Sequence, residues 1–231
     1  MRLAVIGAGR MGAAVRAEAL ARGHEVPFTL GSVDNRQGNG INAERFAGVE
    51  AAIEFTRPDA AAVNVERLLT LGIPVVTGTT GWLQDLPRLE LLARERGAAL
   101  IHSANFSIGV QLLLRAAREI ARWTRDDGFD AAIVERHHRA KVDAPSGTAL
   151  AIQRAARDAD PGHEFPITSM RQGHDPGSHA LRWDARHETL TLSHEVRDRA
   201  VFAAGAVRAA EWLAGRRGVF TFEDVLFGEA P

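Results

Sequence analysis

The feature that most constrains the fold is a glycine-rich turn close to the amino terminus. The short apolar run Leu3-Ala4-Val5-Ile6 is typical of a buried strand, and it is followed at once by Gly7-Ala8-Gly9-Arg10-Met11-Gly12 and a helical stretch to about Arg22. Glycines at this spacing between a strand and a helix allow a tight turn and the close approach of a pyrophosphate, whose charge lies at the helix amino terminus. The pattern therefore predicts a dinucleotide site; the alternative is a glycine-rich turn in another α/β protein.

Strands and helices alternate over roughly the first 105 residues. Further β-type runs are predicted at 25–30, 51–55, 74–77 and 98–101, with helices at about 59–71 and 86–96. This alternation is typical of a doubly wound parallel sheet, which binds ligands at the carboxyl ends of its strands. One of these ends opens into a loop of small residues, Gly78-Thr79-Thr80-Gly81, and another leads into Ser103-Ala104-Asn105-Phe106-Ser107.

The end of the second strand lacks the acidic residue that commonly binds the ribose 2′-hydroxyl of NAD. It reads Leu30-Gly31-Ser32, and Asp34 and Arg36 follow a little further on. No carboxylate at the strand end would repel a 2′-phosphate, and Ser32 and Arg36 could donate hydrogen bonds to it. We therefore expect NADPH to serve at least as well as NADH.

The pattern changes after Ser107. An amphipathic helix at about 108–123 precedes a strand at 131–135, and a helix from Ser146 to about 159 precedes β-type segments at 167–171, 179–183 and 188–196. A helix at 203–213, an extended element at 220–222 and a terminal turn complete the chain. Strands without intervening helices indicate an α+β domain with an open mixed sheet. The expected fold is therefore α/β, with an N-terminal doubly wound dinucleotide-binding (Rossmann) domain and a second α+β domain.

One stretch combines several reactive side chains: Glu135-Arg136-His137-His138-Arg139-Ala140-Lys141-Val142-Asp143-Ala144-Pro145-Ser146-Gly147-Thr148-Ala149-Leu150. Ser146 lies near the N-cap of a predicted helix, so the N–H groups around Gly147 and Thr148 are expected to bind a carboxylate or phosphate. Lys141 is the single lysine, against 27 arginines, and lysine readily gives up a proton whereas arginine does not. The alternative is an exposed polar turn before a surface helix.

Composition excludes several other classes of protein. The formal net charge of −1 gives no basic surface for nucleic acid, and the absence of cysteine excludes disulfides, a thiolate nucleophile and a cysteine-based zinc site. No signal peptide and no apolar run near the roughly 20 residues of a membrane span are visible, so we expect a cytoplasmic protein.

Two other functions are compatible with parts of this pattern. A metal hydrolase could use His137 and His138, but neighbours on a strand point to opposite faces and no carboxylate or third histidine lies at recognisable ligand spacing, so no metal is expected. A non-catalytic nucleotide-binding regulator would retain the glycine-rich turn without needing Lys141 or the paired histidines.

Six segments of the chain resemble, in order, the motifs of the dihydrodipicolinate reductase family of bacterial lysine biosynthesis. They are Gly7 to Gly12, Phe55-Thr56-Arg57-Pro58, Gly78 to Gly81, Ala104 to Ser107, Glu135 to Leu150 and Ala204-Gly205-Ala206-Val207. The resemblance implies reduction of 4-hydroxy-tetrahydrodipicolinate by NADPH or NADH, with loss of water, to tetrahydrodipicolinate. Around residues 31–50 the chain is short for this family, and the adenosine-binding region looks trimmed.

The resemblance also implies roles for single residues. His137 is the expected proton donor and acceptor and Lys141 a proton donor, while the small dicarboxylate substrate contacts His138, Lys141, Gly147 and Thr148. The cofactor contacts are the turn from Gly7 to Gly12, Gly78-Thr79-Thr80, and Ser103 to Phe106. The C-terminal segment is expected to fold back, so that residues 1–106 with 203–231 bind the dinucleotide. Residues 107–202 then bind substrate and assemble a homotetramer.

Overall fold

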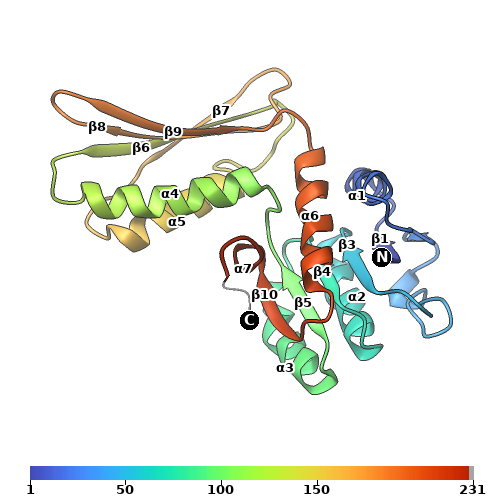
Figure 1. The fold of residues 1–231 in the computed structure, drawn as a ribbon. Helices are drawn as coiled ribbons and strands as arrows, with labels where there is room; N and C mark the ends of the chain where they lie inside the picture. Colours follow the sequence, from blue (N-terminus) through green and yellow to red (C-terminus); the bar gives the residue numbers. More distant parts are fainter. Residues whose placement is uncertain (229–231) are drawn as a thin grey trace. The chain divides into compact units, whose positions relative to one another are not determined.

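The structure is a computed structural model that describes residues 1–228. The chain divides into two compact units (Figure 1): the first unit comprises residues 1–106 and the segment that begins at Ala200, and the second unit comprises residues 107–199. The chain enters the first unit again at Ala200 because helix α6 (Ala200–Leu213) starts there and packs on α1 and on the strands of that unit. The expected boundary between residues 202 and 203 lies inside the first turn of this helix.

The first unit is built on a six-stranded sheet of order β10-β5-β4-β3-β1-β2, in which all neighbours are parallel. The strands are β1 (Leu3–Ile6), β2 (Thr29–Leu30), β3 (Ala51–Glu54), β4 (Val75–Thr77), β5 (Ala99–His102) and β10 (Gly218–Thr221). Three of them, β1, β3 and β4, are buried along their whole length, as strands covered on both faces should be. The expected doubly wound sheet is confirmed, and its strand order reverses between β1 and β3, at the edge where such folds bind ligands.

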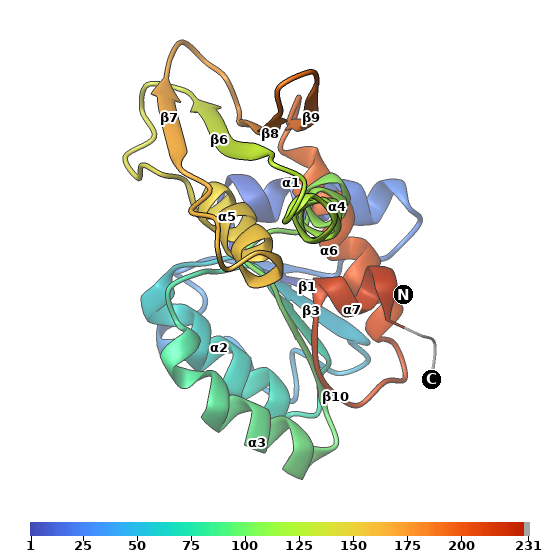
Figure 2. The ribbon, with the colours of Figure 1, turned by 90° about the vertical axis from the view of Figure 1, so that its left-hand side faces the viewer.

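Helices cover both faces of this sheet (Figure 2). Helices α2 (Pro58–Thr70) and α3 (Leu86–Arg96) pack side by side on one face, whereas α1 (Arg10–Ala21) packs against α6 on the other. Two short 3₁₀ turns, η1 (Arg36–Gly38) and η2 (Leu83–Asp85), and the helix α7 (Phe222–Phe227) complete the unit. Within residues 1–228, no helix combines the length and the hydrophobicity that crossing a membrane requires.

Two local predictions in this unit are wrong. The strand expected at 25–30 is regular only at Thr29–Leu30, because Pro27 has no N–H to contribute to a ladder and Glu25 forms only an isolated bridge with Arg2. The terminal turn is instead helix α7. It is stabilised at its start by a reciprocal capping box, in which the side chains of Thr221 and Asp224 bind each other's backbone N–H groups.

The short segment from 31 to 50 packs onto the hydrophobic core of the first unit, to which it belongs. Ile41, Phe46 and Val49 are buried in its hydrophobic core. The Asn35 amide donates to the side-chain oxygen of Asn64 in α2 at 2.8 Å. The segment therefore forms a compact cover over the edge of the sheet near β2.

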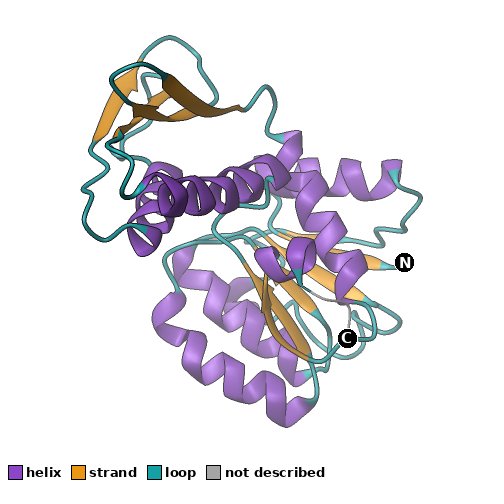
Figure 3. Ribbon diagram, turned by 60° about the vertical axis from the view of Figure 1, so that its left-hand side comes forward, coloured by secondary structure: helices purple, strands orange, loops and turns teal. Residues whose placement is uncertain are grey.

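The second unit contains a four-stranded mixed sheet of order β7-β6-β8-β9. Strand β6 (Asp130–His137) is parallel to β7 (Ile167–Arg171) and antiparallel to β8 (Ser178–Asp184), which pairs in turn with β9 (Thr189–Glu195). Helices α4 (Ile108–Thr124) and α5 (Gly147–Ala159) cover one face of this sheet and leave the other uncovered (Figure 3). The expected open mixed sheet is confirmed, and β6 extends two residues beyond the predicted end at 135.

The helix-covered face of this sheet changes from apolar to polar along its strands. At one end Ile133, Leu181 and Trp183 pack with α4 and α5 in a hydrophobic cluster. At the other end the residues that continue the inward alternation are polar: Glu135 and His137 on β6, His179 on β8 and Arg171 on β7. The fold therefore places a polar group at the carboxyl end of β6, next to the start of α5.

Candidate active site

The glycine-rich turn of the first unit is shaped by close backbone contacts. Gly7 has a φ of 116°, and a Cβ at this position would lie 2.0 Å from the carbonyl oxygen of Phe55. A Cβ at Gly12 would lie 1.7 Å from the carbonyl oxygen of Gly7. The turn therefore lies directly against the end of β3, and α1 starts directly over it.

The amino end of α1 fits a dinucleotide. Its N-cap is Gly9, which provides no side-chain acceptor, and no acidic residue occupies the first turn. A Cβ at Gly9 would meet no atom within 4 Å, so the space beside the helix end is open. Ala8 and Arg10 are exposed beside it, and Met11 is half-buried. N–H donors, a neighbouring cation and free space are what a pyrophosphate needs.

Two further predicted cofactor loops lie at the same edge of the sheet, because β4 and β5 run parallel to β1. The Phe55 ring packs against Gly78, where a Cβ would lie 2.0 Å from it, and edge-on against Phe106 at 6.0 Å between centroids. Thr79 accepts a hydrogen bond from the Thr56 N–H at 2.8 Å through its hydroxyl, while the neighbouring Thr80 is exposed. Gly78, Thr79 and Thr80 are therefore held next to the end of β3.

The loop after β5 is held by its own side chains. The hydroxyl of Ser103 donates to the Asn105 carbonyl at 2.9 Å, and Ala104 between them is exposed. The ring of Phe106 is only 1% exposed and packs on Phe222, so this residue can meet a cofactor only through its backbone. Ser32 and Arg36 follow β2, and both are exposed.

Sequence reasoning missed a buried carboxylate at the end of β3. Glu54 is fully buried, its Oε2 accepts from the Thr77 hydroxyl at 2.6 Å, and its Oε1 accepts from the Thr56 hydroxyl. These bonds connect the ends of β3 and β4. A single glutamate that ends an apolar strand was the available signal.

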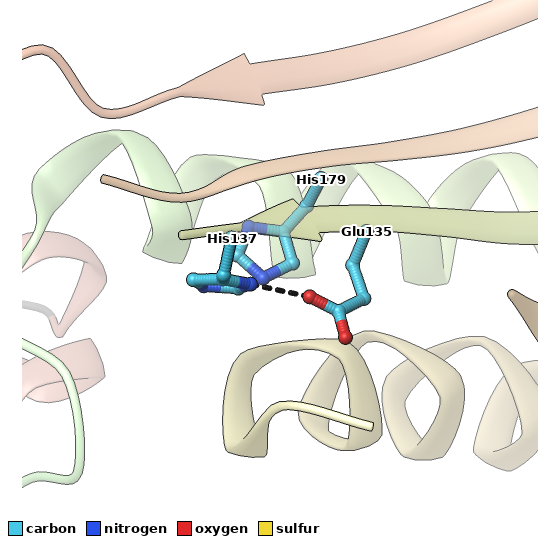
Figure 4. Close-up of side chains that lie close together, drawn as sticks. All are labelled: Glu135, His137 and His179. Carbon is cyan, nitrogen blue, oxygen red and sulfur yellow. Dashed lines mark hydrogen bonds and ion pairs between the residues drawn. The ribbon is translucent and has the colours of Figure 1, made fainter. Parts of the chain in front are cut away.

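In the second unit the predicted residues occupy a strand end, a loop and a helix start. His137 is the last residue of β6, is 8% exposed and binds the Glu135 carboxylate through Nδ1 (Figure 4). His138 follows, half-buried, and its backbone N–H donates to the Asp175 carbonyl at 2.8 Å. The Lys141 ammonium donates to both carboxylate oxygens of Asp143, at 2.6 and 2.9 Å.

The loop ends at the amino terminus of α5. Ser146 is the N-cap, and its hydroxyl accepts from the Ala149 N–H at 3.2 Å. The same hydroxyl lies 3.1 Å from Nε2 of His179. Gly147 and Thr148 are the first two residues of the helix, where backbone N–H groups have no intrahelical acceptor. The predicted substrate residues therefore belong to one strand–loop–helix segment.

Three residues that sequence reasoning left without a role complete this group. Glu135 is fully buried, and Nη2 of Arg171 donates to its Oε1 at 2.8 Å and to the Asp143 carbonyl at 2.6 Å. The rings of His137 and His179 meet edge-on, 5.2 Å between centroids. The signal for these residues was alternation, since Arg171 and His179 continue the inward faces of their strands.

The surroundings separate the protonation states of these groups. Burial lowers the pKa of His179 to about 4, and the nearby His137 adds to this effect. Burial also lowers the pKa of His137, although the Glu135 carboxylate opposes the shift. For Glu135 burial acts to raise the pKa, but hydrogen bonds from Arg171 and His137 outweigh it and lower the pKa to about 2. At neutral pH Glu135 is therefore ionised and His179 is neutral.

Three residues of this cluster also have the side chains of potential metal ligands. Glu135, His137 and His179 offer ligand atoms that all lie within 4.8 Å of one another, a proximity that sequence spacing did not reveal. However, His137 already binds the Glu135 carboxylate, and the Arg171 guanidinium balances its charge. The group is electrically balanced without a cation, and its donor and acceptor pattern suits proton transfer better than metal binding.

Comparison with family models gives the same result for both halves of the chain. Residues 1–106 match the model described as dihydrodipicolinate reductase, N-terminus, and residues 109–226 match the model described as dihydrodipicolinate reductase, C-terminus.

Relatives and solved structures agree with this match. A 4-hydroxy-tetrahydrodipicolinate reductase from Christiangramia forsetii is 31% identical over 239 residues and covers 98% of each chain. One from Haloarcula marismortui is 40% identical over 194 residues, 77% of this chain and 76% of the relative. The structure of dipicolinate-bound dihydrodipicolinate reductase from Paenisporosarcina sp. TG-14 has a TM-score of 0.83 at 21% identity and covers 98% of this chain and 100% of that chain, which shows a shared fold. The chain belongs to the dihydrodipicolinate reductase family of nicotinamide-dependent oxidoreductases.

Proposed function

We propose that the chain reduces 4-hydroxy-tetrahydrodipicolinate to tetrahydrodipicolinate, with loss of water and oxidation of NAD(P)H, in diaminopimelate and lysine biosynthesis. The observation that carries the proposal is the segment from His137 to Thr148. It joins a buried imidazole, an ammonium group and the amino end of a 13-residue helix in one unit, while the other unit provides a glycine-rich nucleotide turn. Family membership supports the same reaction.

His137 and Lys141 are assigned as the proton donors. Loss of water converts the substrate to a conjugated cyclic imine. A nicotinamide held at the glycine-rich turn would supply a hydride to this imine, and the addition would leave negative charge on the ring. An acid must supply a proton as this charge develops, and an imidazolium or an ammonium group can do so. The positive charge of Lys141 acts on His137, where it lowers the pKa, so the two groups share one electrostatic environment.

The start of α5 is assigned to the substrate carboxylates. Gly147 and Thr148 present backbone N–H groups at the positive end of a 13-residue helix. The half-buried His138 imidazole and the Lys141 ammonium would add side-chain donors from the loop that precedes it. Two carboxylates bound at fixed points would hold the ring in one orientation for hydride transfer.

The cofactor site favours NADPH at least as much as NADH. Strand β2 ends at Leu30 without an acidic residue, and Ser32 and Arg36 are exposed just beyond it. A guanidinium and a hydroxyl can donate to a 2′-phosphate.

The uncovered face of the sheet in the second unit supports assembly as a homotetramer. Val134 and Met170 on this face are 39% and 42% exposed. Light scattering after size exclusion tests the assembly: Val134→Asp with Met170→Asp should reduce the mass, whereas Leu91→Asp on α3, exposed in the first unit, should not. A wild-type mass of one chain at micromolar concentration would contradict it.

One assay tests the reaction. Oxidation of NADPH, followed by absorbance with enzymatically generated 4-hydroxy-tetrahydrodipicolinate, should proceed with the wild type and fall by at least about 10²-fold in kcat with His137→Gln. A regulator would bind NADPH without oxidising it, and a hydrolase would consume no cofactor. Either result with the wild type overturns the proposal.

A further inference from the structure

Two branches of hydrogen bonds start at the Glu135 carboxylate in the second unit: the first leads to His137, and the second leads through Arg171 to the loop that carries Lys141. The carboxylate is fully buried, yet it accepts hydrogen bonds from two cationic or potentially cationic side chains that come from different strands. One oxygen binds Nδ1 of His137, two residues along β6, and the other binds Nη2 of Arg171 on β7. A buried charge with two such partners defines the position of both of them.

The first branch fixes the tautomer of His137. Because Glu135 is ionised it can only accept, so Nδ1 of His137 must carry the hydrogen. The other ring nitrogen, Nε2, is therefore the atom that gains and loses a proton. It faces Gly177, where a Cβ would lie 2.9 Å away, so only a residue without a side chain leaves room beside this atom. The carboxylate thus selects which nitrogen serves as the acid.

The second branch reaches the loop that carries Lys141. Nη2 of Arg171 donates to Glu135 and also to the backbone carbonyl of Asp143. The side chain of Asp143 in turn holds the Lys141 ammonium. Arg171 is 18% exposed and stands opposite His137 in the β6–β7 register, so its position is set by the sheet and not by the loop.

We propose that Glu135 is a positioning residue for both proton donors, holding His137 directly and Lys141 through Arg171 and Asp143. This inference rests on the proposed function, because it assumes that His137 and Lys141 are the acids. It assigns to Glu135 and Arg171 a role that neither the motif nor the relatives' names provide. Neither residue needs to touch the substrate.

Glu135→Gln isolates the effect of the charge, since glutamine keeps the shape of Glu135 but not its negative charge. Arg171 only donates, so the amide oxygen would turn toward it and the amide NH₂ group toward His137. Nδ1 would then become the acceptor and the hydrogen would move to Nε2, the reverse of the wild-type tautomer. Lys141, Arg171 and His179 are the remaining ionisable groups that act on this imidazole or lie against it, and none of them offers Nδ1 a carboxylate.

The test combines kinetics with NMR of ¹⁵N-labelled imidazoles. Glu135→Gln should lower kcat about 10²-fold, exchange the protonated and unprotonated nitrogens of His137, and move the alkaline fall of kcat/KM to lower pH. The last effect follows because the carboxylate that favours imidazolium is gone. Glu164→Gln, on an exposed residue beyond the carboxyl end of α5, is the matched control and should leave all three unchanged.

Arg171→Lys tests the second branch separately. A lysine keeps a positive charge beside Glu135 but has one nitrogen in place of a planar fork. It should leave the His137 tautomer unchanged and raise KM for the substrate about tenfold, because the Lys141 loop loses its anchor. A tautomer exchange in this variant, or unaltered kinetic constants, contradicts the second branch.

The outcomes separate this inference from the proposed function. If the wild type oxidises NADPH with the substrate but Glu135→Gln keeps more than about a third of kcat, only the positioning role is overturned. If the wild type does not react, the proposed function is overturned. Imidazole NMR of the wild type needs neither activity nor a stable variant, and a hydrogen on Nε2 of neutral His137 would overturn the role of Glu135 by itself.

Discussion

The two units form their sites from different chemical groups, backbone in the first unit and ionisable side chains in the second. In the first unit the site consists mainly of backbone: a turn in which Cβ atoms at Gly7 or Gly12 would collide with carbonyl groups, and a helix end without a side-chain cap. In the second unit the site consists of ionisable side chains that hold one another through buried hydrogen bonds, centred on Glu135. Added atoms should therefore damage the first site, and altered charge should damage the second.

The largest expected effect is the addition of one methyl group to the first site. Gly12→Ala places a Cβ within 1.7 Å of the Gly7 carbonyl oxygen, and backbone cannot yield as a flexible side chain can. We expect the free energy of unfolding to fall by about 4 kcal/mol or more. Urea denaturation measures this change.

Gly9→Ala is the matched control, because a Cβ there meets no atom within 4 Å. Its free energy of unfolding should change by less than about 0.5 kcal/mol, as for most surface positions. Its Kd for NADPH should still rise, since the methyl group enters the space assigned to the pyrophosphate. Equal stability of the two alanine variants would refute a backbone-built site.

The second effect is specific to the charged site and depends on pH. The pKa of His179 is lowered by burial from its ordinary value of 6.5 to about 4. As the pH falls below 6.5 the unfolded chain binds a proton that the folded chain does not bind, so stability decreases until about pH 4. The loss is at most about 3 kcal/mol. Glu135, with a pKa of about 2, adds a further loss only as the pH falls below its ordinary value of 4.5.

Urea denaturation at pH 7 and pH 4.5 measures this loss in the wild type and in His179→Gln. The variant has no imidazole at this position, so its free energy of unfolding should fall distinctly less between the two pH values. The same decrease in both proteins would show that His179 does not cause the acid sensitivity.

The contrast between the two sites also explains what the sequence could predict. The turn from Gly7 to Gly12 is local, so its strand, glycines and helix are all visible within a few residues. Arg171 and Glu135, by contrast, are 36 residues apart, and Ser146 and His179 are 33 apart. Their contacts depend on the register of β6 with β7 and β8, which no local pattern specifies.

The two wrong predictions of secondary structure, for β2 and α7, have local causes. Pro27 interrupts a stretch whose composition otherwise favours a strand, and the single N–H that it lacks limits β2 to two residues. At the other end of the chain, Thr221 and Asp224 are separated by the spacing of a capping box, which starts α7 where a turn was expected. A missing N–H in one case and a capping box in the other determined these two short elements, whereas hydrophobic periodicity predicted the longer ones.

The third effect distinguishes charge from proton supply in the second site. Lys141→Arg keeps a cation beside Asp143 and can still bind a carboxylate. Arginine does not release its proton near neutral pH, since its pKa is above about 12. We expect kcat to fall about 10²-fold, equivalent to about 2.7 kcal/mol, with little change in cofactor Kd. Steady-state kinetics and fluorescence titration of NADPH measure the two quantities.

Retention of more than about a third of wild-type kcat would leave Lys141 as an anchor for the substrate only. The proton would then come from His137, and His137→Gln should abolish the remaining activity. In that case the second site would need one acid and not two.

The smallest effect concerns a charged side chain in the first site. Arg36 is exposed beyond β2, and the strand end has no carboxylate, so a 2′-phosphate would find a cation and no repulsion there. Arg36→Ala should lower kcat/KM for NADPH about tenfold, or about 1.4 kcal/mol, and leave the value for NADH unchanged. Added salt should reduce the difference between the cofactors, because the pair of Arg36 and the 2′-phosphate is exposed.

Arg45→Ala, in the same segment and also exposed, is the control and should affect neither cofactor. Equal losses for both cofactors would mean that Arg36 supports the fold of the segment, and a tenfold preference of the wild type for NADH would mean that the first site recognises its ligand through backbone alone.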